Sequence, residues 1–494
     1  MQIYNSRTRK KEEIIPHKKG SIEMYTCGPT VYHYAHIGNL RTYIMEDVLE
    51  RTLNAEGNYV RRVMNITDVG HLTSDGDTGD DKMLKGAKRE HKSVMEIAQF
   101  YTDAFFADCE KLNIKRPKYV IPATERIKDV IKVVSGLMDK GYAYEAGGNI
   151  YFDTSKLDRY YVFGDVSEED LEVGVREGVE ADENKRNKAD FVLWFTKSKF
   201  DDQELKWDSP WGVGYPGWHI ECSSISMKYN GEYLDLHCGG IDNQFPHHTN
   251  EIAQSEAYLG HEWCPYWFHV HHLNTAGGKM SKSKGEFLTV SLLEEKGYDP
   301  MVYRFFCLQS HYRKTLTFDW DNLDNAKGAY EKLVARVAAV LKQDGYVPYH
   351  DPSVPDLMLK EIQSGDNTRE HFKVEVIFDD FLAEVGDDLN TAQGLTVLYD
   401  VLKSDDLRKY RKLLAIEKID DVLGLSLIDR AEKLIQSELA AESDIPAEIS
   451  ELVEQRAAAR KEKNFALADE LRDKISELGW AVEETREGTK VHRR

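Results

Sequence analysis

The stretch from residue 22 to residue 66 constrains the fold of this 494-residue chain more than any other. It begins with a short apolar segment at 22–26, turns at a Cys-Gly-Pro-Thr tetrapeptide, and continues from Asn39 with apolar residues at helical spacing. Gly57 marks the expected end of this helix, and residues 59–66 form a second apolar run. Strand, helix and strand in this order predict a βαβ unit, and therefore a parallel sheet.

The pattern of a parallel sheet returns later in the chain. Residues 233–237 and 266–273 are strand candidates, and a helix is expected between them. The intervening segment 142–207 is weakly patterned and partly acidic, so we interpret it as an insertion outside the sheet. Beyond Trp320 the pattern becomes helical, and the last residues alternate like a short hairpin.

The charge balance of the chain is strongly acidic, with 65 Lys and Arg against 86 Asp and Glu and a formal net charge of −21. This excludes a generally basic, histone-like nucleic-acid binder, although local basic patches can still contact RNA. The longest stretch without Lys, Arg, Asp or Glu, 24–40, contains a proline and two histidines, so we expect no membrane span. The first residues lack the apolar core of a secretory signal and cysteines are few, so we expect a cytoplasmic protein with reduced thiols.

Two segments have the composition of phosphate-binding sites. The first, His36-Ile37-Gly38-Asn39, opens the predicted helix, whose N-terminal N–H groups and partial positive charge suit a phosphate. Imidazole and amide side chains can both donate to phosphate oxygens. The second, 277–285, places three lysines and two serines between glycines, in a loop that can bring cations to a polyphosphate. Taken alone, the first segment is equally compatible with a polar helix cap and the second with a solvated basic loop.

A group of cysteine, histidine and glutamate residues indicates a metal site. His247 and Glu251 are four residues apart on a predicted helix, so both side chains lie on one face. Cys27 ends the first strand, and Cys222 follows a turn. Two thiols, an imidazole and a carboxylate form a four-coordinate set of the kind that binds zinc. Spacing alone does not select this set, because other residues compete as ligands: His237, Cys238, His248, His269, His271 and His272.

The two phosphate-binding segments, in this order, are similar to the signature motifs of class I aminoacyl-tRNA synthetases. Longer strings narrow the similarity, and the chain resembles the cysteinyl-tRNA synthetase family over nearly its whole length. The strings that carry the resemblance are MYTCGPTVYHYAHIGNLRTY, NITDVGHL, WDSPWGVGYPGWHIECS, DLHCGGIDNQFPHHTNEIAQSE, GGKMSKSKGEF, DDLNTAQGL and LADELRDKISELGWAVEETREGTKV.

The resemblance implies an α/β fold, in which a Rossmann-type parallel-sheet catalytic domain with an insertion is followed by an α-helical bundle and a small C-terminal domain. The boundaries that we expect are 1–115 for the first half of the Rossmann domain, 116–207 for the connective insertion, 208–275 for the second half with the zinc site, 276–320 for the KMSKS loop and stem-contact segment, 321–443 for a tRNA-binding helical bundle, and 444–494 for the domain that recognises the anticodon.

The resemblance also implies roles for single residues. The family's zinc ligands fall on Cys27, Cys222, His247 and Glu251. Its HIGH and KMSKS motifs fall on 36–39 and 279–283, which makes the expected catalytic residues His36, Asn39, Lys279 and Lys282. The residues expected to bind ATP are His36, Gly38, Asn39, Gly240, Asp242 and Lys282. Gly240 and Asp242, together with Gly239, belong to the loop expected to face the adenosine. Those expected to bind the amino acid are Cys27, Thr67 and Trp218.

The chain departs from the family pattern at two positions. Asn39 stands where the HIGH motif ends in histidine, so it can donate a neutral hydrogen bond but cannot carry a charge. Its share in stabilising the transition state is therefore open. Cys238 stands in HCGG where many relatives have HGGG, and we interpret it as a small filler of the core instead of a ligand.

The implied activity is that of a cysteine–tRNA ligase acting on ATP, L-cysteine and tRNA-Cys. The resemblance further implies one Zn²⁺ per chain, which selects the thiol, Mg²⁺ bound with ATP, and a monomer. Basic clusters near the C-terminus would contact the RNA backbone: Arg456, Arg460, Lys461 and Lys463, and then Lys490, Arg493 and Arg494.

Three other functions share parts of this pattern: a ligase that transfers cysteine to a small amine, a non-catalytic RNA-binding paralogue, and a plain nucleotidyltransferase. The long segment after Trp320 argues against the first alternative. The retained ligands and motif lysines argue against the second, and the KMSKS loop argues against the third.

Overall fold

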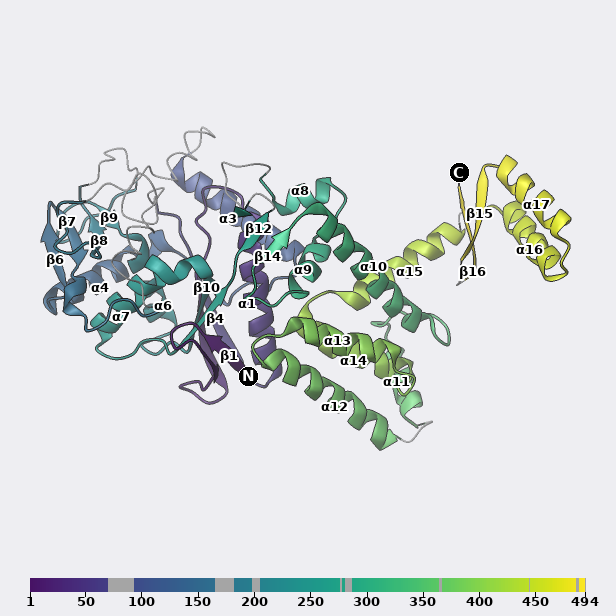
Figure 1. Ribbon diagram of the computed structural model, residues 1–494, viewed down its shortest axis with the longest axis horizontal. Coiled ribbons are helices and arrows are strands. Elements are labelled where there is room, and N and C mark those ends of the chain that lie inside the picture. The colour runs from purple at the N-terminus through teal and green to yellow at the C-terminus, as the bar shows by residue number, and fades with distance from the viewer. Residues whose placement is uncertain are drawn as a thin grey trace. The chain divides into compact units, whose positions relative to one another are not determined.

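The computed structural model describes residues 1–69, 93–164, 182–197, 205–275, 278–279, 287–363, 367–443, 445–485 and 488–493 (Figure 1). The chain forms two compact units. The first comprises Met1–Tyr330, Thr368–Asp405 and Leu414–Leu425, and the second comprises Glu331–Asn367, Asp406–Leu413 and Ser426–Arg494. The region expected as one helical bundle, 321–443, is therefore shared between the two units.

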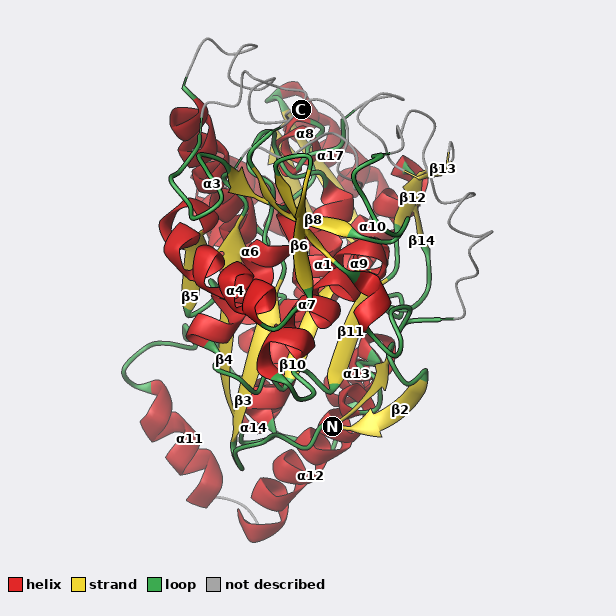
Figure 2. Ribbon diagram, turned by 90° about the vertical axis from the view of Figure 1, so that its left-hand side faces the viewer, coloured by secondary structure: helices red, strands yellow, loops and turns green. Residues whose placement is uncertain are grey.

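A five-stranded parallel sheet forms the centre of the first unit, as the βαβ pattern predicted. Its strands lie in the order β11 (Tyr266–Val270), β10 (Leu236–Gly240), β3 (Ser21–Thr26), β4 (Tyr59–Ile66) and β5 (Tyr119–Pro122). Figure 2 shows this order from right to left. Because neighbouring strands are parallel, the carboxyl ends of β3 and β10 lie at the same edge of the sheet, where α/β proteins bind their ligands.

Helices cover both faces of this sheet. Helix α1 (Ile37–Ala55) joins β3 to β4 and lies on one face, while α6 (Trp218–Tyr229) and α7 (Thr249–Leu259) lie on the other (Figure 1). The other α-helices before β14, within the described residues, are α3 (Val94–Lys111), α4 (Ile127–Asp139), α8 (Val290–Glu295) and α9 (Pro300–Leu308). Since α9 also packs against α1, even polar residues of α1 such as Arg41 and Asp47 are fully buried.

The insertion forms a sheet of its own. Its strands β6 (Ala143–Ala146), β7 (Asn149–Phe152), β8 (Phe191–Phe195) and β9 (Tyr215–Pro216) pair in antiparallel fashion. The boundaries predicted at 115 and 207 differ from this arrangement, because β5 belongs to the parallel sheet and β9 to the insertion. Both strands are short and end in proline, so neither produces a hydrophobic period that could be assigned to one sheet.

Smaller elements complete the first unit. A hairpin of β1 (Gln2–Asn5) and β2 (Lys10–Glu13) opens the chain, and a three-stranded sheet contains β12 (Leu273–Thr275), β13 (Gly278–Lys279) and β14 (Leu316–Phe318). The helices that follow are α10 (Trp320–Lys342), α12 (Asn367–Gly386), α13 (Thr391–Lys403) and α14 (Lys409–Leu423), and both α10 and α14 are divided between the two units. Strand β12 is important for the site, because it leads directly into the segment with the motif lysines.

The second unit contains the C-terminal helices and hairpin. Its elements include α11 (Val354–Gln363), α15 (Leu427–Ser443), α16 (Ala447–Lys461), α17 (Phe465–Glu477), β15 (Trp480–Thr485) and β16 (Gly488–Arg493). A small core holds the last four of these together: Ile449, Leu452, Leu471, Ile475 and Trp480. The predicted hairpin is confirmed.

One member of the predicted basic clusters is placed differently by the structure. Arg456 lies on the inner face of α16 and is only 8% exposed, so it is not available to an RNA backbone. Arg460, Lys461 and Lys463 are exposed at the end of α16 and just after it. Among the described residues, no helix is long and apolar enough to cross a membrane.

Candidate active site and metal centre

A cavity of about 410 Å³ opens at the edge of the sheet where β3 and β10 end. The cavity is lined by residues that are widely separated in the sequence, among them Cys27, His36, Gly38, Asn39, Trp218, Gly240 and Asp242. They come from the end of β3, the first turn of α1, the first turn of α6 and the end of β10. The cavity therefore joins the candidate ATP-binding residues to the candidate amino-acid site.

The first turn of α1 lies at this cavity, and its N-terminus is capped by a histidine side chain. His36 is the N-cap residue, and its ring Nδ1 accepts a hydrogen bond from the backbone N–H of Asn39 at 3.1 Å. Because Nδ1 accepts, the neutral ring carries its proton on Nε2, the atom that can donate to a phosphate oxygen. A side chain at Gly38 would place its Cβ 3.0 Å from His36 Nδ1, so glycine keeps this cap unobstructed.

Asn65 at the end of β4 holds the turn after β3. Its side-chain oxygen accepts from the backbone N–H of Gly28 at 2.8 Å, and its amide nitrogen donates to the hydroxyl of Thr67 at 3.0 Å. A Cβ on Gly28 would lie 1.6 Å from the carbonyl oxygen of Asn65, so only glycine fits there. Thr67, an expected substrate contact, is buried in this network and does not line the cavity. Asn65 lies in the NITDVGHL string, but no motif in the sequence indicates its role in holding the turn.

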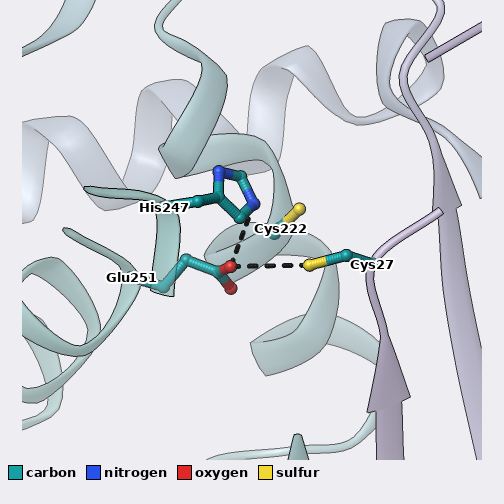
Figure 3. A group of neighbouring side chains, drawn as sticks. All are labelled: Cys27, Cys222, His247 and Glu251. Atoms are coloured by element: carbon teal, nitrogen blue, oxygen red, sulfur yellow. Dashed lines mark hydrogen bonds and ion pairs between the residues drawn. The ribbon is translucent and has the colours of Figure 1, made fainter. Parts of the chain in front are cut away.

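Four possible metal ligands meet beside the cavity (Figure 3). The ligand atoms of Cys27, Cys222, His247 and Glu251 all lie within 4.8 Å of one another. Glu251 Oε1 is 3.1 Å from His247 Nε2 and 3.7 Å from Cys27 Sγ. Cys27 comes from the end of β3, Cys222 from α6, and Glu251 from α7. His247 lies in a π-helical turn, Gln244–His248, just before α7, and not within the regular helix expected for it.

The charges of this group are set by burial and by one another. Burial would lower the pKa of His247, but Glu251 and Cys222 raise it to about 10. Burial would raise the pKa of Glu251, but His237 and His247 hold it at about 2. Burial would also raise the pKa of Cys222, but a hydrogen bond with Cys27 lowers it to about 7, whereas burial and Cys222 raise the pKa of Cys27. A carboxylate and a readily formed thiolate suit a divalent cation.

Further histidines surround these four residues. His237 Nε2 lies 3.0 Å from Glu251 Oε2, and His219 Nδ1 lies 2.9 Å from His247 Nδ1. His248 Nε2 lies 3.3 Å from Cys27 Sγ. A second combination of ligand atoms within 4.8 Å therefore exists: Cys27, His237, His248 and Glu251. From the sequence, His237 and His248 are competing metal ligands, whereas no pattern in the sequence indicates that His219 contacts a ligand residue.

The motif lysines lie at the limit of the described residues. Lys279 is in β13, whose backbone pairs with β12 through Asn274. Lys282 lies outside the described residues, as does the remainder of the KMSKS motif after Lys279. Because β12 follows the cavity-lining residues His271 and His272, the segment with the lysines starts at the same cavity.

Comparisons with known proteins assign this chain to a class. Residues 13–328 match the family model described as "tRNA synthetases class I (C) catalytic domain", so the chain has the catalytic domain of a class I tRNA synthetase. Residues 442–492 match the model "Cysteinyl-tRNA ligase anticodon binding domain". The chain belongs to the cysteine–tRNA ligase family. This confirms the resemblance that the sequence motifs indicated.

Curated relatives are similar to this chain over nearly its whole length. The chain is 46% identical to "Cysteine--tRNA ligase" of Treponema denticola over 486 residues, which are 98% of either protein. It is 42% identical to the enzyme of the same name from Borreliella burgdorferi over 494 residues, covering 100% of this chain and 99% of that one. A LeuRS–tRNA–LeuAMS complex of Agrobacterium radiobacter has a similar fold, with a TM-score of 0.55 at 11% identity over 85% of this chain and 86% of that chain.

Proposed function

We propose that this chain activates L-cysteine with ATP and transfers it to the terminal adenosine of tRNA-Cys. The observation that carries the proposal is the single cavity at the end of β3 and β10. There the His36–Asn39 turn, Gly240 and Asp242 lie beside Cys27 and Trp218, next to a group of four metal-ligand atoms. The family and the names of its relatives support the same activity.

In the first step, a carboxylate oxygen of cysteine attacks the α-phosphorus of ATP, and pyrophosphate leaves with the electrons of the broken P–O bond. Such a displacement needs positioning and charge stabilisation more than a covalent enzyme group. His36 Nε2 and Asn39 donate to phosphate oxygens at the N-terminus of α1. Lys279 and Lys282 stabilise the pyrophosphate as its charge develops, and Mg²⁺ accompanies ATP. In the second step, the terminal 2′-hydroxyl of tRNA attacks the carbonyl carbon and AMP leaves.

Of the two ligand combinations, we propose that Cys27, Cys222, His247 and Glu251 hold zinc. A metal-bound histidine usually has its other ring nitrogen hydrogen-bonded. His247 meets this condition through His219, whereas His237 Nδ1 is buried without a hydrogen-bond partner among the described residues. The first combination also supplies two thiols, which are the softer ligands that zinc accepts.

Selectivity against serine is the chemical reason for a metal here. Serine differs from cysteine by one atom, and a pocket distinguishes near-isosteres poorly by shape. When bound, zinc supplies a soft Lewis acid that prefers a thiolate to a hydroxyl. Trp218 packs its ring 4.4 Å from that of His247 and lines the cavity, so it orients this ligand and closes the amino-acid side of the site.

A charging assay tests the proposal. Purified full-length protein is incubated with total tRNA, ATP and either labelled cysteine or labelled serine. We expect cysteine to be attached to one acceptor species and serine attachment to be below detection. Cysteine-dependent pyrophosphate exchange without transfer to tRNA would contradict the proposed acceptor. It would favour a small-amine acceptor, although the C-terminal family match argues against this alternative.

Removal of the C-terminal elements is expected to separate the two steps. A chain ending at Ser443 keeps the cavity and the four ligand residues but loses α16, α17 and the β15–β16 hairpin. We expect pyrophosphate exchange to persist, and the KM for tRNA to rise strongly, because stacked bases contribute about 1–3 kcal/mol each. The salt dependence of tRNA binding should also become shallower. Unchanged charging by the truncated chain would show that these elements do not bind tRNA.

The remaining assignments follow from the proposed role in tRNA charging. We propose that the protein acts in the cytoplasm, where tRNA is charged for translation, and as a monomer. The domain boundaries are proposed as expected from the sequence, apart from the two limits of the insertion and the bundle 321–443, which is shared between the two units.

A further inference from the structure

Arg41 on α1 is a fully buried cation that binds only neutral groups. It lies two residues after Asn39 and is 0% exposed. Its Nη1 donates to the carbonyl oxygens of His271 and His272 at 2.7 Å each, and its Nη2 donates to those of Lys314 at 2.7 Å and His311 at 3.3 Å. Among the described residues, no carboxylate lies within ion-pair distance of it. A buried charge therefore depends on four backbone carbonyls for its stabilisation.

These carbonyls immediately precede two paired strands. His271 and His272 stand before β12, and Lys314 stands before β14, with which β12 pairs in parallel. The guanidinium thus holds the starting points of both strands against the first turns of α1. Strand β12 pairs with β13, which contains Lys279, so the contact with Arg41 lies at the base of the strand pair that carries this lysine.

The other end of the same segment is also bound to α1. The backbone N–H of Ile37 donates to the carbonyl oxygen of Leu288 at 2.9 Å, and the hydroxyl of Tyr303 donates to the carbonyl oxygen of Ile37 at 2.6 Å. Leu273, the first residue of β12, approaches Gly38 closely enough that a Cβ there would lie 3.6 Å from its own Cβ. The helix that begins with His36 is therefore fixed to the chain on both sides of the lysine segment.

We propose that Arg41 is a positioning residue that sets the β12–β13 pair, and with it Lys279 at the start of the KMSKS motif, relative to His36 and Asn39. The inference rests on the proposed function, in which both motifs act on one ATP molecule. A displacement of about 1 Å between groups that act together costs up to about 100-fold in rate. Lysine cannot replace arginine here, because a single ammonium cannot reach both pairs of carbonyls in the forked geometry of a guanidinium.

Arg304 provides a matched control. It is also 0% exposed in the same unit, and it also donates to backbone carbonyls, at 2.8 Å to Leu423 and 3.0 Å to Leu112. Unlike Arg41, it is ion-paired with Asp47 at 2.7 Å, and none of its hydrogen bonds within the described part of the chain goes to 36–39 or to Lys279. A general loss of core stability should therefore appear in variants of both arginines, whereas a loss of positioning should appear only in variants of Arg41.

The experiment compares Arg41→Lys and Arg304→Lys in cysteine-dependent ATP–pyrophosphate exchange, with rates normalised to folded protein. We expect Arg41→Lys to lower kcat about 10- to 100-fold while the KM values for ATP and cysteine change less than about threefold. Arg304→Lys should lower the melting temperature but leave kcat within about threefold. Equal kcat values for the two variants would overturn the inference, as would an Arg41 effect confined to KM.

A double-mutant cycle with Lys282→Ala tests the coupling directly. If Arg41 acts through the lysine segment, the loss of exchange rate caused by Lys282→Ala should be at least about tenfold smaller in the Arg41→Lys background than in the otherwise unchanged protein. In the Arg304→Lys background, Lys282→Ala should cause its full loss of rate. Multiplicative effects in both backgrounds would overturn the inference. If Lys282→Ala alone leaves the rate unchanged, the role of Lys282 in the proposed function fails, and the kcat comparison above still decides on Arg41.

A second variant covers the case in which Arg41→Lys does not fold. Arg41→Gln is neutral, keeps two donors and avoids a buried unpaired charge. If it folds, the same kcat prediction applies to it. If neither Arg41 variant folds under conditions where Arg304→Lys does, Arg41 is a residue of stability only and the inference is overturned.

Discussion

Replacing Cys222 by serine is expected to abolish stoichiometric zinc and to raise the KM for cysteine by at least about 100-fold. Four-ligand zinc sites bind with roughly 10–16 kcal/mol, so one ligand contributes about 2.5–4 kcal/mol, which corresponds to a factor of about 10²–10³ in affinity. The side chain is 1% exposed and lies within 4.8 Å of the other three ligand atoms, so no solvent-exposed group can substitute for it. Metal analysis and pyrophosphate exchange at varied cysteine concentration measure the two effects.

Two control variants make this prediction specific. Cys238→Ala removes another fully buried thiol, which lies in β10 of the parallel sheet and outside both ligand combinations, so zinc content should stay at one per chain. His237→Gln distinguishes the combinations, because it removes the imidazole that contacts Glu251 and should weaken zinc binding about 10- to 100-fold without abolishing it. Full zinc occupancy in Cys222→Ser together with none in His237→Gln would assign the metal to the second combination.

Lys282→Ala is expected to lower the rate of cysteinyl-adenylate formation about 10²–10³-fold with much smaller changes in the KM for ATP. The size of the effect is that of losing one electrostatic contact that forms only in the transition state. Single-turnover formation of the adenylate measures it without interference from product release.

Lys284→Ala is the matched control for this variant. It removes an equal charge two residues further along the same segment, from a position outside the KMSKS motif, and should lower adenylate formation much less than Lys282→Ala does. Equal losses in both variants would mean that the segment contributes general positive charge. An effect of Lys282→Ala on KM alone would mean that the lysine binds ATP without acting in the transition state.

Sequence reasoning predicted the elements whose apolar residues lie on one face of a helix or follow one another along a short strand. Strands β3 and β4 and helix α1 were predicted because their apolar residues recur at the periods of strand and helix. Helix α6 was overlooked. Its consecutive residues from His219 to Ser226 are all buried, including Glu221, so it has no polar face and gives no amphipathic signal.

The candidate site shows more clearly that a sequence pattern relates only residues that are close along the chain. The i, i+4 relation of His247 and Glu251 was readable from the sequence, and the two side chains do meet. Nothing local connects this pair with Cys27 and Cys222, which only the resemblance to a family supplied. His219 could have been found had α6 been predicted, because it precedes Cys222 by three residues and so shares its face of the helix.

The position of β3 in the middle of the parallel sheet has a consequence for biosynthesis. Its neighbour β10 and the ligand Glu251 are translated long after it, since Cys27 and Glu251 are 224 residues apart. At ribosomal rates of 5–20 residues per second, roughly 10–45 s separate the two residues. During this interval the nascent chain has one open edge on β3 and no complete set of zinc ligands. The proposed metal site therefore has all its ligands only after the insertion has been synthesised, so that metal uptake would report that the catalytic core has closed.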